Sequence, residues 1–309
     1  MMKLAVGEVV GNYRLTRFLG RGGFALVYQG EHLETGEKVA LKFGNNAGGG
    51  RYVTRLFEVT SRRTPEGISP DETPAEAIFF QQGGMRIDFL DVEEIDHLLY
   101  QEAETLNAIG SPNFVKVKDV LEEEGRPVVA LDYVRGKVLR DKIRNLEAIH
   151  LNWFLALVRA LEEAAESGNL AYHGDLKPEN VLIKPSGKVV LIDPSYRYPE
   201  KGVISTTPHY NPLLLQDGRA DVMAVGIMIY EILTGTLPFD EVPWDYAGTN
   251  TGGETIRLSL SFFLSYPPPS SLNPRTPPEL EQIIYRCITG KGYGIPDLRT
   301  DLEEFIRNV

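Results

Sequence analysis

The sequence predicts an α+β protein of two lobes, the first built around an antiparallel β-sheet and the second mainly helical. Its 309 residues are enough for two packed lobes, at about 150 residues per domain. Short β-like runs occupy the N-terminal part, whereas apolar residues recur at helical spacing from Leu151 onward. We therefore assign residues 1–134 to the first lobe and residues 135–309 to the second.

The composition is that of a soluble globular protein, with 42% hydrophobic and 24% charged residues. A net charge of −11 argues against a surface for nucleic acid or for an anionic membrane. The chain has one cysteine, Cys287, and its N-terminus lacks an apolar signal-peptide core, so we expect a cytoplasmic protein. The most apolar run, Val222 to Leu233, is too short to span a bilayer.

The first lobe begins with two β-like runs, Tyr13–Leu19 and Leu26–Gly30, around a glycine-rich turn that reads G-R-G-G-F-A-L-V from Gly20 to Val27. Glycines let backbone N–H groups approach a phosphate closely. A third run, V-A-L-K, ends at Lys42. An ordinary hairpin turn and an exposed strand end would explain these features separately, but together they favour a phosphate site.

Residues 44–94 interrupt this pattern, and we interpret them as an inserted β-rich subregion; the alternative is a mobile loop. Residues 51–60 alternate as in a strand. A further strand at Ala77–Gln82 is predicted to pair with Met85–Leu90 across Gly83-Gly84, because two glycines between strand-like runs are typical of a hairpin.

The first lobe ends with a helix, a hairpin and a hinge. Apolar residues at helical spacing predict a helix over Val92–Ile109, and Glu102 lies within it. A glutamate on a helix is usually a solvated surface residue. Phe114–Val120 and Pro127–Leu131 are predicted to form a hairpin, and Asp132–Gly136 is a candidate hinge between the lobes.

A polar loop in the second lobe, Y-H-G-D-L-K-P-E-N-V-L-I at residues 172–183, carries the most chemical information. Asp175, Lys177 and Asn180 fall at i, i+2 and i+5. Pro178 disfavours a regular helix through them, so a loop can direct all three side chains into one space. An acid, a cation and an amide together suit a hydroxyl that meets a phosphate and a metal. The alternative is a polar surface turn before a strand.

The rest of the second lobe is expected to be helical around one short strand. A helix is predicted at Leu151–Ser167, and Val189–Ile192 is a strand that ends at Asp193. A carboxylate at that strand end, beside Asn180, is what a divalent metal that prefers oxygen ligands requires. Residues 195–212 show no regular pattern. Further helices, of which the first is apolar nearly all round, are expected at Asp221–Leu233, Leu280–Ile288 and Leu298–Ile306.

Taken in order, these motifs resemble the protein kinase family in its eukaryotic-type serine/threonine form, and the resemblance covers nearly the whole chain. It implies a bilobal kinase fold with ATP bound between the lobes and Mg²⁺ on the phosphates. It also implies transfer of the γ-phosphate to a serine or threonine hydroxyl of a protein substrate. The D-L-K-P-E-N motif favours serine or threonine over tyrosine by this resemblance alone.

The resemblance also implies the catalytic roles. Asp175 is expected to accept the proton of the substrate hydroxyl, and Lys177 to steady the γ-phosphate. Lys42 is expected on the α- and β-phosphates. Its ion-pair partner would be Glu102, with Glu104 as the alternative.

Metal and nucleotide ligands follow from the same resemblance. Asp193 is expected to hold the main Mg²⁺, and Asn180 a second one. Leu131 stands at the gatekeeper position. The residues expected around the nucleotide are Leu19, Gly20, Gly22, Gly23, Phe24, Val27, Ala40, Lys42, Leu131, Asp132, Val134 and Leu182.

The chain departs from the family pattern at three places. Gly174 replaces an arginine that normally pairs with a phosphate on the activation segment, so we hypothesise that activity does not depend on phosphorylation there. Pro194-Ser195 replaces Phe-Gly, so the usual aromatic switch is missing. Thr207 matches the threonine that such kinases place against the catalytic aspartate. Leu213 replaces a glutamate, so we expect Arg299 to lack its usual buried partner.

Two other functions remain as alternatives. H-G-D and I-D-P also resemble small-molecule kinases of the aminoglycoside and fructosamine kinase type, and a pseudokinase would bind nucleotide only as an interaction module. The glycine-rich turn and the Lys-Pro-Glu after Asp175 favour protein kinases, and all the catalytic charges are present. The insertion at 44–94 lies between Lys42 and Glu102, so we hypothesise that it is a regulatory element or docks a partner.

Overall fold

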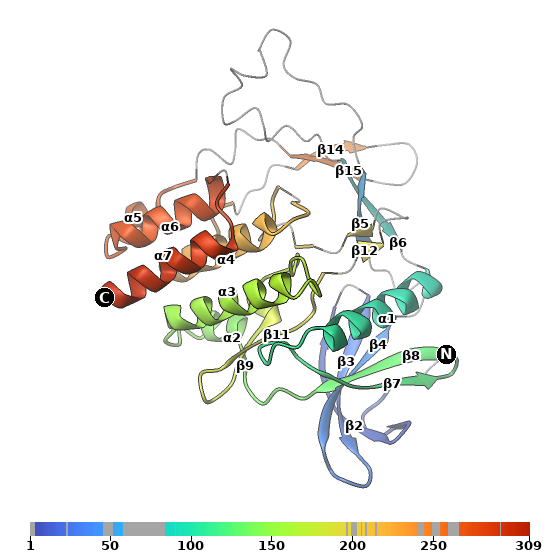
Figure 1. Cartoon of the computed structure of the whole chain (residues 1–309). Helices are drawn as coiled ribbons and strands as arrows, with labels where there is room; N and C mark the ends of the chain where they lie inside the picture. Colours follow the sequence, from blue (N-terminus) through green and yellow to red (C-terminus); the bar gives the residue numbers. More distant parts are fainter. Residues whose placement is uncertain are drawn as a thin grey trace.

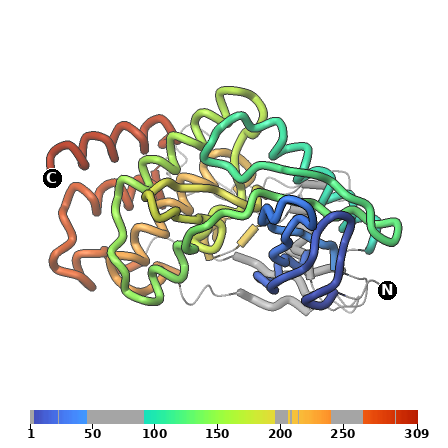
Figure 2. Tube along the Cα trace, turned by 90° about the horizontal axis from the view of Figure 1, so that it is seen from below, coloured from blue at the N-terminus to red at the C-terminus, as the bar shows by residue number. Residues whose placement is uncertain are grey.

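A sheet with one long helix makes up one part of the molecule, and a bundle of helices makes up the other (Figure 1). This structure is a computed structural model of the chain. It describes residues 4–22, 24–45, 52–57, 84–89, 91–195, 197–198, 203–204, 206–207, 209–213, 215–239, 244–248, 254–258, 266–290 and 292–309. The two ends of the chain lie at opposite ends of the molecule (Figure 2).

The first sheet has six antiparallel strands in the order β1-β2-β3-β4-β8-β7. In the central strand, Val39, Leu41 and Phe43 alternate with residues of the other face and are all buried. They pack with Val128 and Ala130 in a small apolar cluster, which leaves Lys42 on the opposite face. The strands are β1 (Val9–Val10), β2 (Tyr13–Arg21), β3 (Ala25–His32), β4 (Lys38–Gly44), β7 (Val117–Glu123) and β8 (Arg126–Asp132).

The helix α1 (Val92–Ala108), which the apolar spacing predicts, packs against β4 and β8. Asp91 begins it, because its side chain accepts a hydrogen bond from the N–H of Glu94 while the Glu94 side chain accepts one from the N–H of Asp91. The buried residues of this helix include Leu98, Leu99 and the acidic residue Glu102. Glu102 therefore points into the protein and is not the solvated surface residue that a helical glutamate usually is.

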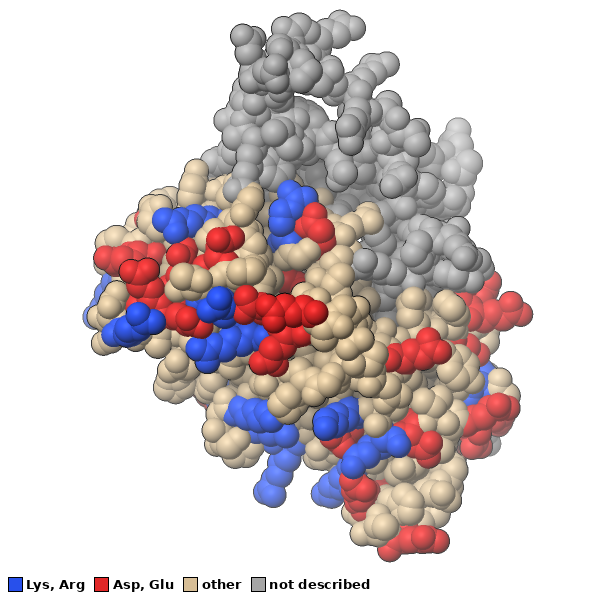
Figure 3. All heavy atoms as spheres, in the orientation of Figure 1, with Lys and Arg blue, Asp and Glu red and all other residues tan. Residues whose placement is uncertain are grey.

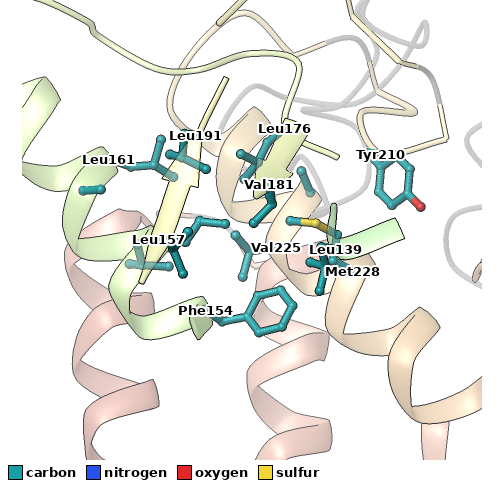
Figure 4. Packing of buried hydrophobic residues seen from close by; sticks show 14 of the residues in the cluster. Leu139, Phe154, Leu157, Leu161, Leu176, Val181, Leu191, Tyr210, Val225 and Met228 are labelled. Carbon is teal, nitrogen blue, oxygen red and sulfur yellow. The ribbon is translucent and has the colours of Figure 1, made fainter. Parts of the chain in front are cut away.

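The helical part is organised around α4 (Arg219–Thr234), which is buried through most of its length. Phe154, Leu157 and Leu161 of α3 gather with Val225 and Met228 of α4 in the main core (Figure 4). Gly235 ends α4 in the left-handed conformation that favours glycine. The other helices are α2 (Leu139–Arg144), α3 (Leu151–Glu166), α5 (Pro269–Leu272), α6 (Pro278–Thr289) and α7 (Ile295–Asn308).

A small antiparallel sheet in the second lobe has the order β11-β10-β9. Its strands are β9 (Lys137–Val138), β10 (Val181–Ile183) and β11 (Val189–Leu191). Val181 lies opposite Leu191, and the N–H of Ile192 donates to the carbonyl of Asn180 at 3.1 Å. This register brings Asn180, just before β10, close to Asp193, just after β11.

A third sheet is formed by three segments that lie far apart in the sequence, in the order β12-β13-β5-β6-β15-β14. Residue 203 in β13 lies opposite residue 55 in β5, and residues 255–256 in β15 lie opposite residues 85–86 in β6. The strands are β5 (Tyr52–Phe57), β6 (Gly84–Phe89), β12 (Arg197–Tyr198), β13 (Val203–Ile204), β14 (Trp244–Gly248) and β15 (Glu254–Leu258).

This third sheet corrects two expectations. The strand expected at Met85–Leu90 is present as β6, but it pairs with β5 and β15 rather than across a Gly83-Gly84 turn. Ala77–Gln82, its expected partner, lies outside the described residues. Gly84 is the first residue of β6, and Gly83 also lies outside the described residues. The segment 195–212, expected to be irregular, contributes β12 and β13.

Arg299 pairs with acidic residues on two helices, not with the position of Leu213. Its Nε atom lies 2.7 Å from Oε2 of Glu162, and its Nη1 donates to Oε1 of Glu303 at 3.1 Å. The reason is that α3 and α7 pack together, so α3 supplies the carboxylate. Leu213 instead packs against the main apolar core.

Charged groups on the face of the molecule shown in Figure 3 are mixed, with lysine and arginine interspersed among aspartate and glutamate. None of the helices in the described parts of the chain combines the length and the hydrophobicity that crossing a bilayer requires.

Candidate active site

Lys42 links the two lobes. Its Nζ lies 2.9 Å from Oε1 and 2.7 Å from Oε2 of Glu102. The same Nζ lies 2.9 Å from Oδ1 of Asp193. These residues come from β4, from α1 and from the segment after β11, so one ammonium group joins the sheet, its helix and the second lobe.

The positive charge of Lys42 and the negative charges of Glu102 and Asp193 stabilise one another. The Lys42 side chain is 5% exposed and that of Glu102 is 0% exposed. Burial alone would lower the pKa of Lys42, but attraction to Asp193 and Glu102 outweighs it and raises the pKa to about 12. Burial would likewise raise the pKa of Asp193, but Lys42 holds that pKa below its usual value. Lys42 therefore stays protonated and Asp193 ionised at neutral pH.

Asp175, Lys177 and Thr207 form a closed triangle of contacts. Lys177 Nζ donates to Oδ2 of Asp175 and to Oγ1 of Thr207, each at 2.7 Å. The Thr207 hydroxyl donates to the other carboxylate oxygen of Asp175, also at 2.7 Å. Asn180 Nδ2 donates to the Asp175 carbonyl at 2.8 Å. The structure thus brings together the three loop residues that the sequence singled out.

The backbone of this loop has the expected form. Lys177 is extended, with φ −160° and ψ 163°, and Pro178 begins a short 3-10 turn that includes Asn180. Proline fixes its own φ and disfavours helix in the residue before it. Lys177 and Asn180 can both reach Asp175 because the chain turns between them. We refer to residues 173–180 as the catalytic loop.

Asp221, at the start of α4, binds the backbone of the catalytic loop. It is buried, and its carboxylate accepts hydrogen bonds from the N–H of His173 at 2.6 Å and from that of Gly174 at 2.8 Å. Sequence reasoning found the helix but missed this contact. The available signal was an acidic residue at the head of an otherwise apolar helix.

Gly174 occupies a position that excludes a side chain. Its φ is +77°, and a Cβ atom there would lie 2.8 Å from Cβ of Ser195. The N–H of Ser195 donates to the carbonyl of His173 at 2.6 Å. The segment from residue 193 to residue 212, called here the activation segment, therefore begins in direct contact with the catalytic loop.

A second polar cluster lies beside the catalytic loop, and sequence reasoning missed it. Arg140 of α2 donates to Oε1 of Glu179 at 2.7 Å, and it also contacts Glu231 of α4 and the hydroxyl of Tyr210. The Tyr210 hydroxyl donates to Oε2 of Glu231 at 2.6 Å. Burial and the Glu231 carboxylate raise the pKa of Tyr210 above its usual value. These contacts join α2, the catalytic loop, the activation segment and α4.

Phe24, one of the residues expected around the nucleotide, lies close to Lys42. The Lys42 Nζ lies 5.5 Å from the centre of the Phe24 ring. Ala40 lies opposite Leu131 in the β4–β8 pair, and the N–H of Gly22 closes a tight turn onto the carbonyl of Ala25 at 2.8 Å. Gly23 lies outside the described residues. The other expected residues are Leu19 and Gly20 in β2, Val27 in β3, Asp132 at the end of β8, Val134 just after it and Leu182 in β10.

The donor set at Asp193 and Asn180 suits Mg²⁺. In the described part of the chain, no three or more His, Cys, Asp or Glu side chains form a metal-binding group. Mg²⁺ at phosphate sites needs only one or two protein oxygens, because phosphates and water fill the other positions. Asp193 offers a carboxylate that is 36% exposed. Asn180 uses its amide nitrogen on Asp175, so its oxygen is the atom suited to a cation.

Comparison with known families decides the assignment. Residues 89–291, which are more than half of the chain, match the protein kinase domain. The chain belongs to the protein kinase family. The matched region includes α1, the catalytic loop, Asp193 and α4, whereas the glycine-rich turn and Lys42 of this kinase-family chain precede it.

Curated relatives carry the names of serine/threonine-protein kinases. The chain is 28% identical over 308 residues to serine/threonine-protein kinase Pkn1 of Myxococcus xanthus, covering 93% of this chain and 36% of that protein. It is 23% identical over 321 residues to PrkC of Bacillus subtilis, covering 98% of this chain and 41% of that protein. The chain therefore spans less than half the length of these relatives.

Solved structures confirm the fold. The PknI kinase domain of Mycobacterium tuberculosis matches with a TM-score of 0.60 at 20% identity, covering 98% of this chain and 99% of that one. A structure described as the apo form of PpkA-294 matches with a TM-score of 0.61 at 16% identity, covering 97% and 99%. The bilobal kinase fold predicted from the sequence, with an antiparallel sheet in one lobe and helices in the other, is confirmed.

Proposed function

We propose that this kinase-family chain transfers the γ-phosphate of ATP to serine or threonine hydroxyls of a protein substrate. The observation that carries the proposal is the arrangement of two charged clusters. Lys42 with Glu102 and Asp193 forms one, and Asp175 with Lys177 and Asn180 forms the other. Phosphoryl transfer needs little covalent help from a protein, but it needs positioned reactants and neutralised charge.

Asp175 is proposed to accept the proton of the attacking hydroxyl. A general base must be held within hydrogen-bond reach of that proton. Lys177 at 2.7 Å and the amide of Asn180 hold Asp175 from two sides, and Asp221 fixes the backbone just before it. Lys177 also carries the positive charge closest to Asp175, which supports its proposed role at the γ-phosphate.

Lys42 is proposed to bind the α- and β-phosphates. Its raised pKa keeps it protonated at neutral pH, and Glu102 orients it from the buried face of α1. Asp193 and Asn180 are the residues that would hold Mg²⁺. A bound Mg²⁺ would neutralise negative charge on the phosphate oxygens. Phe24, Ala40 and Leu131 are proposed to line the nucleotide site, with the other residues expected there.

Transfer of labelled phosphate from ATP with Mg²⁺ to generic protein substrates tests the proposal. Wild type should label serine or threonine, and Asp175→Asn and Lys42→Met should lower the rate about a hundredfold or more, because each removes a group that acts in the transition state. Asp119→Asn is the matched control, since Asp119 is exposed on β7 and bonds only to the neighbouring N–H of Val120 among the contacts described.

The label distinguishes the alternatives. Label on small molecules alone would replace this proposal with a small-molecule kinase, and no transfer to any acceptor would favour a nucleotide-binding pseudokinase. Label on serine or threonine that persists in Asp175→Asn would contradict the role proposed for Asp175.

Two further proposals concern the setting of this activity. We place the protein in the cytoplasm because it has a single cysteine, which is buried. We also propose that the insertion at 44–94 regulates activity or docks a partner, because its strand β5 pairs with β13 of the activation segment. A variant without the insertion that kept its activity, its substrate choice and its partners would contradict the second proposal.

A further inference from the structure

Thr206 and Asn211 lie on either side of Thr207 in the activation segment, and their side chains are bonded to each other. The hydroxyl of Thr206 donates to the carbonyl of Gly174 at 2.9 Å. Asn211 Nδ2 donates to Oγ1 of Thr206 at 3.2 Å. The Thr206 hydroxyl therefore donates a hydrogen bond to the catalytic loop and accepts one from Asn211.

Asn211 is also tied to the chain that follows it. Its Nδ2 donates to the carbonyl of Leu215 at 3.0 Å, and its Oδ1 accepts from the N–H of Leu215 at 2.9 Å. The residue is 3% exposed, although asparagine is mostly a surface residue. Its amide thus makes three hydrogen bonds in a buried site, where an unpaired polar group would be costly.

We infer that Thr206 and Asn211 are positioning residues that hold Thr207 against Asp175. The inference rests on the proposed function of the site. Consecutive residues of one segment bond to consecutive residues of the other, with Thr206 on Gly174 and Thr207 on Asp175. Moving Thr206 away from the catalytic loop would move its neighbour Thr207 with it.

Hydrogen bonds link the two ends of the turn between Thr206 and Asn211. The carbonyl of Thr207 accepts hydrogen bonds from the N–H groups of Tyr210 and Asn211, each at 3.0 Å. The bond from Asn211 to Thr206 then joins the end of the turn to its beginning. The position of Thr207 is therefore set by the backbone of the turn and by the two side chains that close it.

Gly174 contacts the activation segment at two points. Because it has no side chain, Ser195 can pack beside it, and its carbonyl accepts the hydrogen bond from Thr206. The activation segment is thus joined to the catalytic loop by neutral hydrogen bonds at the position of Gly174.

Substitutions at Thr206 test the inference through its hydroxyl. Thr206→Val keeps the shape and removes the hydroxyl, and Thr206→Ser keeps the hydroxyl. We expect Thr206→Val to lower kcat for a peptide substrate about tenfold, with nucleotide affinity within about twofold of wild type, because the two partly buried hydrogen bonds of this hydroxyl are lost away from the nucleotide. Thr206→Ser should recover most of kcat, whereas a purely structural role would lower kcat and nucleotide affinity together.

The matched control is Thr300→Val. The Thr300 hydroxyl also donates to a carbonyl at 2.9 Å, that of Pro296, but on the exposed face of α7. The Thr300→Val variant should leave kcat unchanged. Asn211→Asp keeps the acceptor for Leu215 and removes both donors, so it should lower kcat in the same direction as Thr206→Val.

Amide hydrogen exchange separates failure of this inference from failure of the proposed function, because it needs no turnover. Thr206→Val should speed exchange in residues 206–215 and in the catalytic loop, and leave α7 unchanged. If wild type transfers no phosphate but exchange behaves in this way, the proposed function falls and the positioning role stands. If wild type is active but Thr206→Val changes neither kcat nor exchange, or if Thr206→Ser fails to rescue, the inference is wrong.

Discussion

Lys42 bonds to two carboxylates from different parts of the chain, that of Glu102 in α1 and that of Asp193 in the second lobe. A buried lysine on its own would lose its proton easily, because burial penalises the charged form. Here the two acids reverse that tendency. The position of α1 and the protonation of Lys42 are therefore linked: if α1 moved away, Lys42 would lose one of the charges that keep it protonated.

Side-chain NMR of lysines labelled at Cε measures this effect. Lys42 should titrate near pH 12, above the ordinary lysine value of about 10.5. Because the folded-state pKa is raised, the contribution to stability is fully present below about pH 10.5 and is lost as the pH rises toward 12. For Asp193 the folded-state pKa is lowered, so its contribution is lost only as the pH falls below the usual aspartate value of 3.8.

Glu102→Gln serves as the comparison for that titration. It removes one of the two negative charges and keeps the size of the side chain, so the Lys42 resonance should titrate at lower pH than in wild type. Titration of Lys42 in wild type at or below the ordinary lysine value of about 10.5 would show that the two acids do not outweigh burial.

At the scale of elements, the pairing of β13 with β5 joins the activation segment to the insertion that follows β4. Val203 lies opposite Arg55, and β12 lies on the outer side of β13. The strand that leads toward Thr206 is thus held by backbone pairing at one end, while the catalytic loop holds Thr206 and Thr207 at the other.

A disulfide between Arg55→Cys and Val203→Cys tests this register. Residues directly opposite in an antiparallel pair have Cα atoms about 4.5–5.5 Å apart, which a disulfide can bridge. Mild oxidation should therefore give an intramolecular cross-link, detected by mass and by mobility on a non-reducing gel. The native Cys287 is buried and does not compete.

The control pair is Arg55→Cys with Tyr198→Cys. Tyr198 lies in β12, one strand farther from β5, so the two Cα atoms are separated by roughly 9–10 Å and cannot be bridged without backbone movement. Equal cross-linking of both pairs would show that this register is not the one present in solution.

At the scale of the whole molecule, two of the hydrogen bonds between the activation segment and the catalytic loop lie at His173 and Gly174 and involve no charged group. Ser195 donates from its N–H to His173, and Thr206 donates from its hydroxyl to Gly174. A side chain at residue 174 would collide with Ser195. The independence from phosphorylation proposed from the sequence thus has a structural reason, although it stays a prediction.

Phosphatase treatment measures that independence. Protein freed of phosphate, as checked by mass spectrometry, should retain transfer activity within about twofold of untreated protein, a change of less than 1 kcal/mol in the barrier. The phosphatase is removed before the assay so that product label is not lost. Activity that disappears on treatment and returns on incubation with ATP would contradict the prediction. The experiment uses phosphatase rather than alanine substitution, because replacing Thr206 by alanine would also remove its hydrogen bond to Gly174.

Local patterns in the sequence predicted much of this arrangement. Pro178 constrains the chain around Lys177, so the convergence of the catalytic-loop side chains could be expected from spacing. The apolar period likewise predicted the helix α1, but the burial of Glu102 on it was not read from that period. Contacts between distant residues could not be found in this way: Asp221 meets the N–H of His173 from 48 residues away.

The third sheet shows the same limit. A pair of glycines suggested a local turn, but β6 finds its partners in β5 and in β15. Strand alternation tells which face a residue occupies, but not which other strand will lie beside it. Long-range pairing therefore remained outside what the sequence pattern could indicate.

The mixed origin of that sheet has a consequence for anyone who rebuilds this protein. Neighbouring strands come from residues 52–89, 197–204 and 244–258, so none of the three segments is a self-contained module. Grafting residues 52–89 alone onto another scaffold would leave open strand edges, which invite aggregation. A successful graft would carry all three segments as a set.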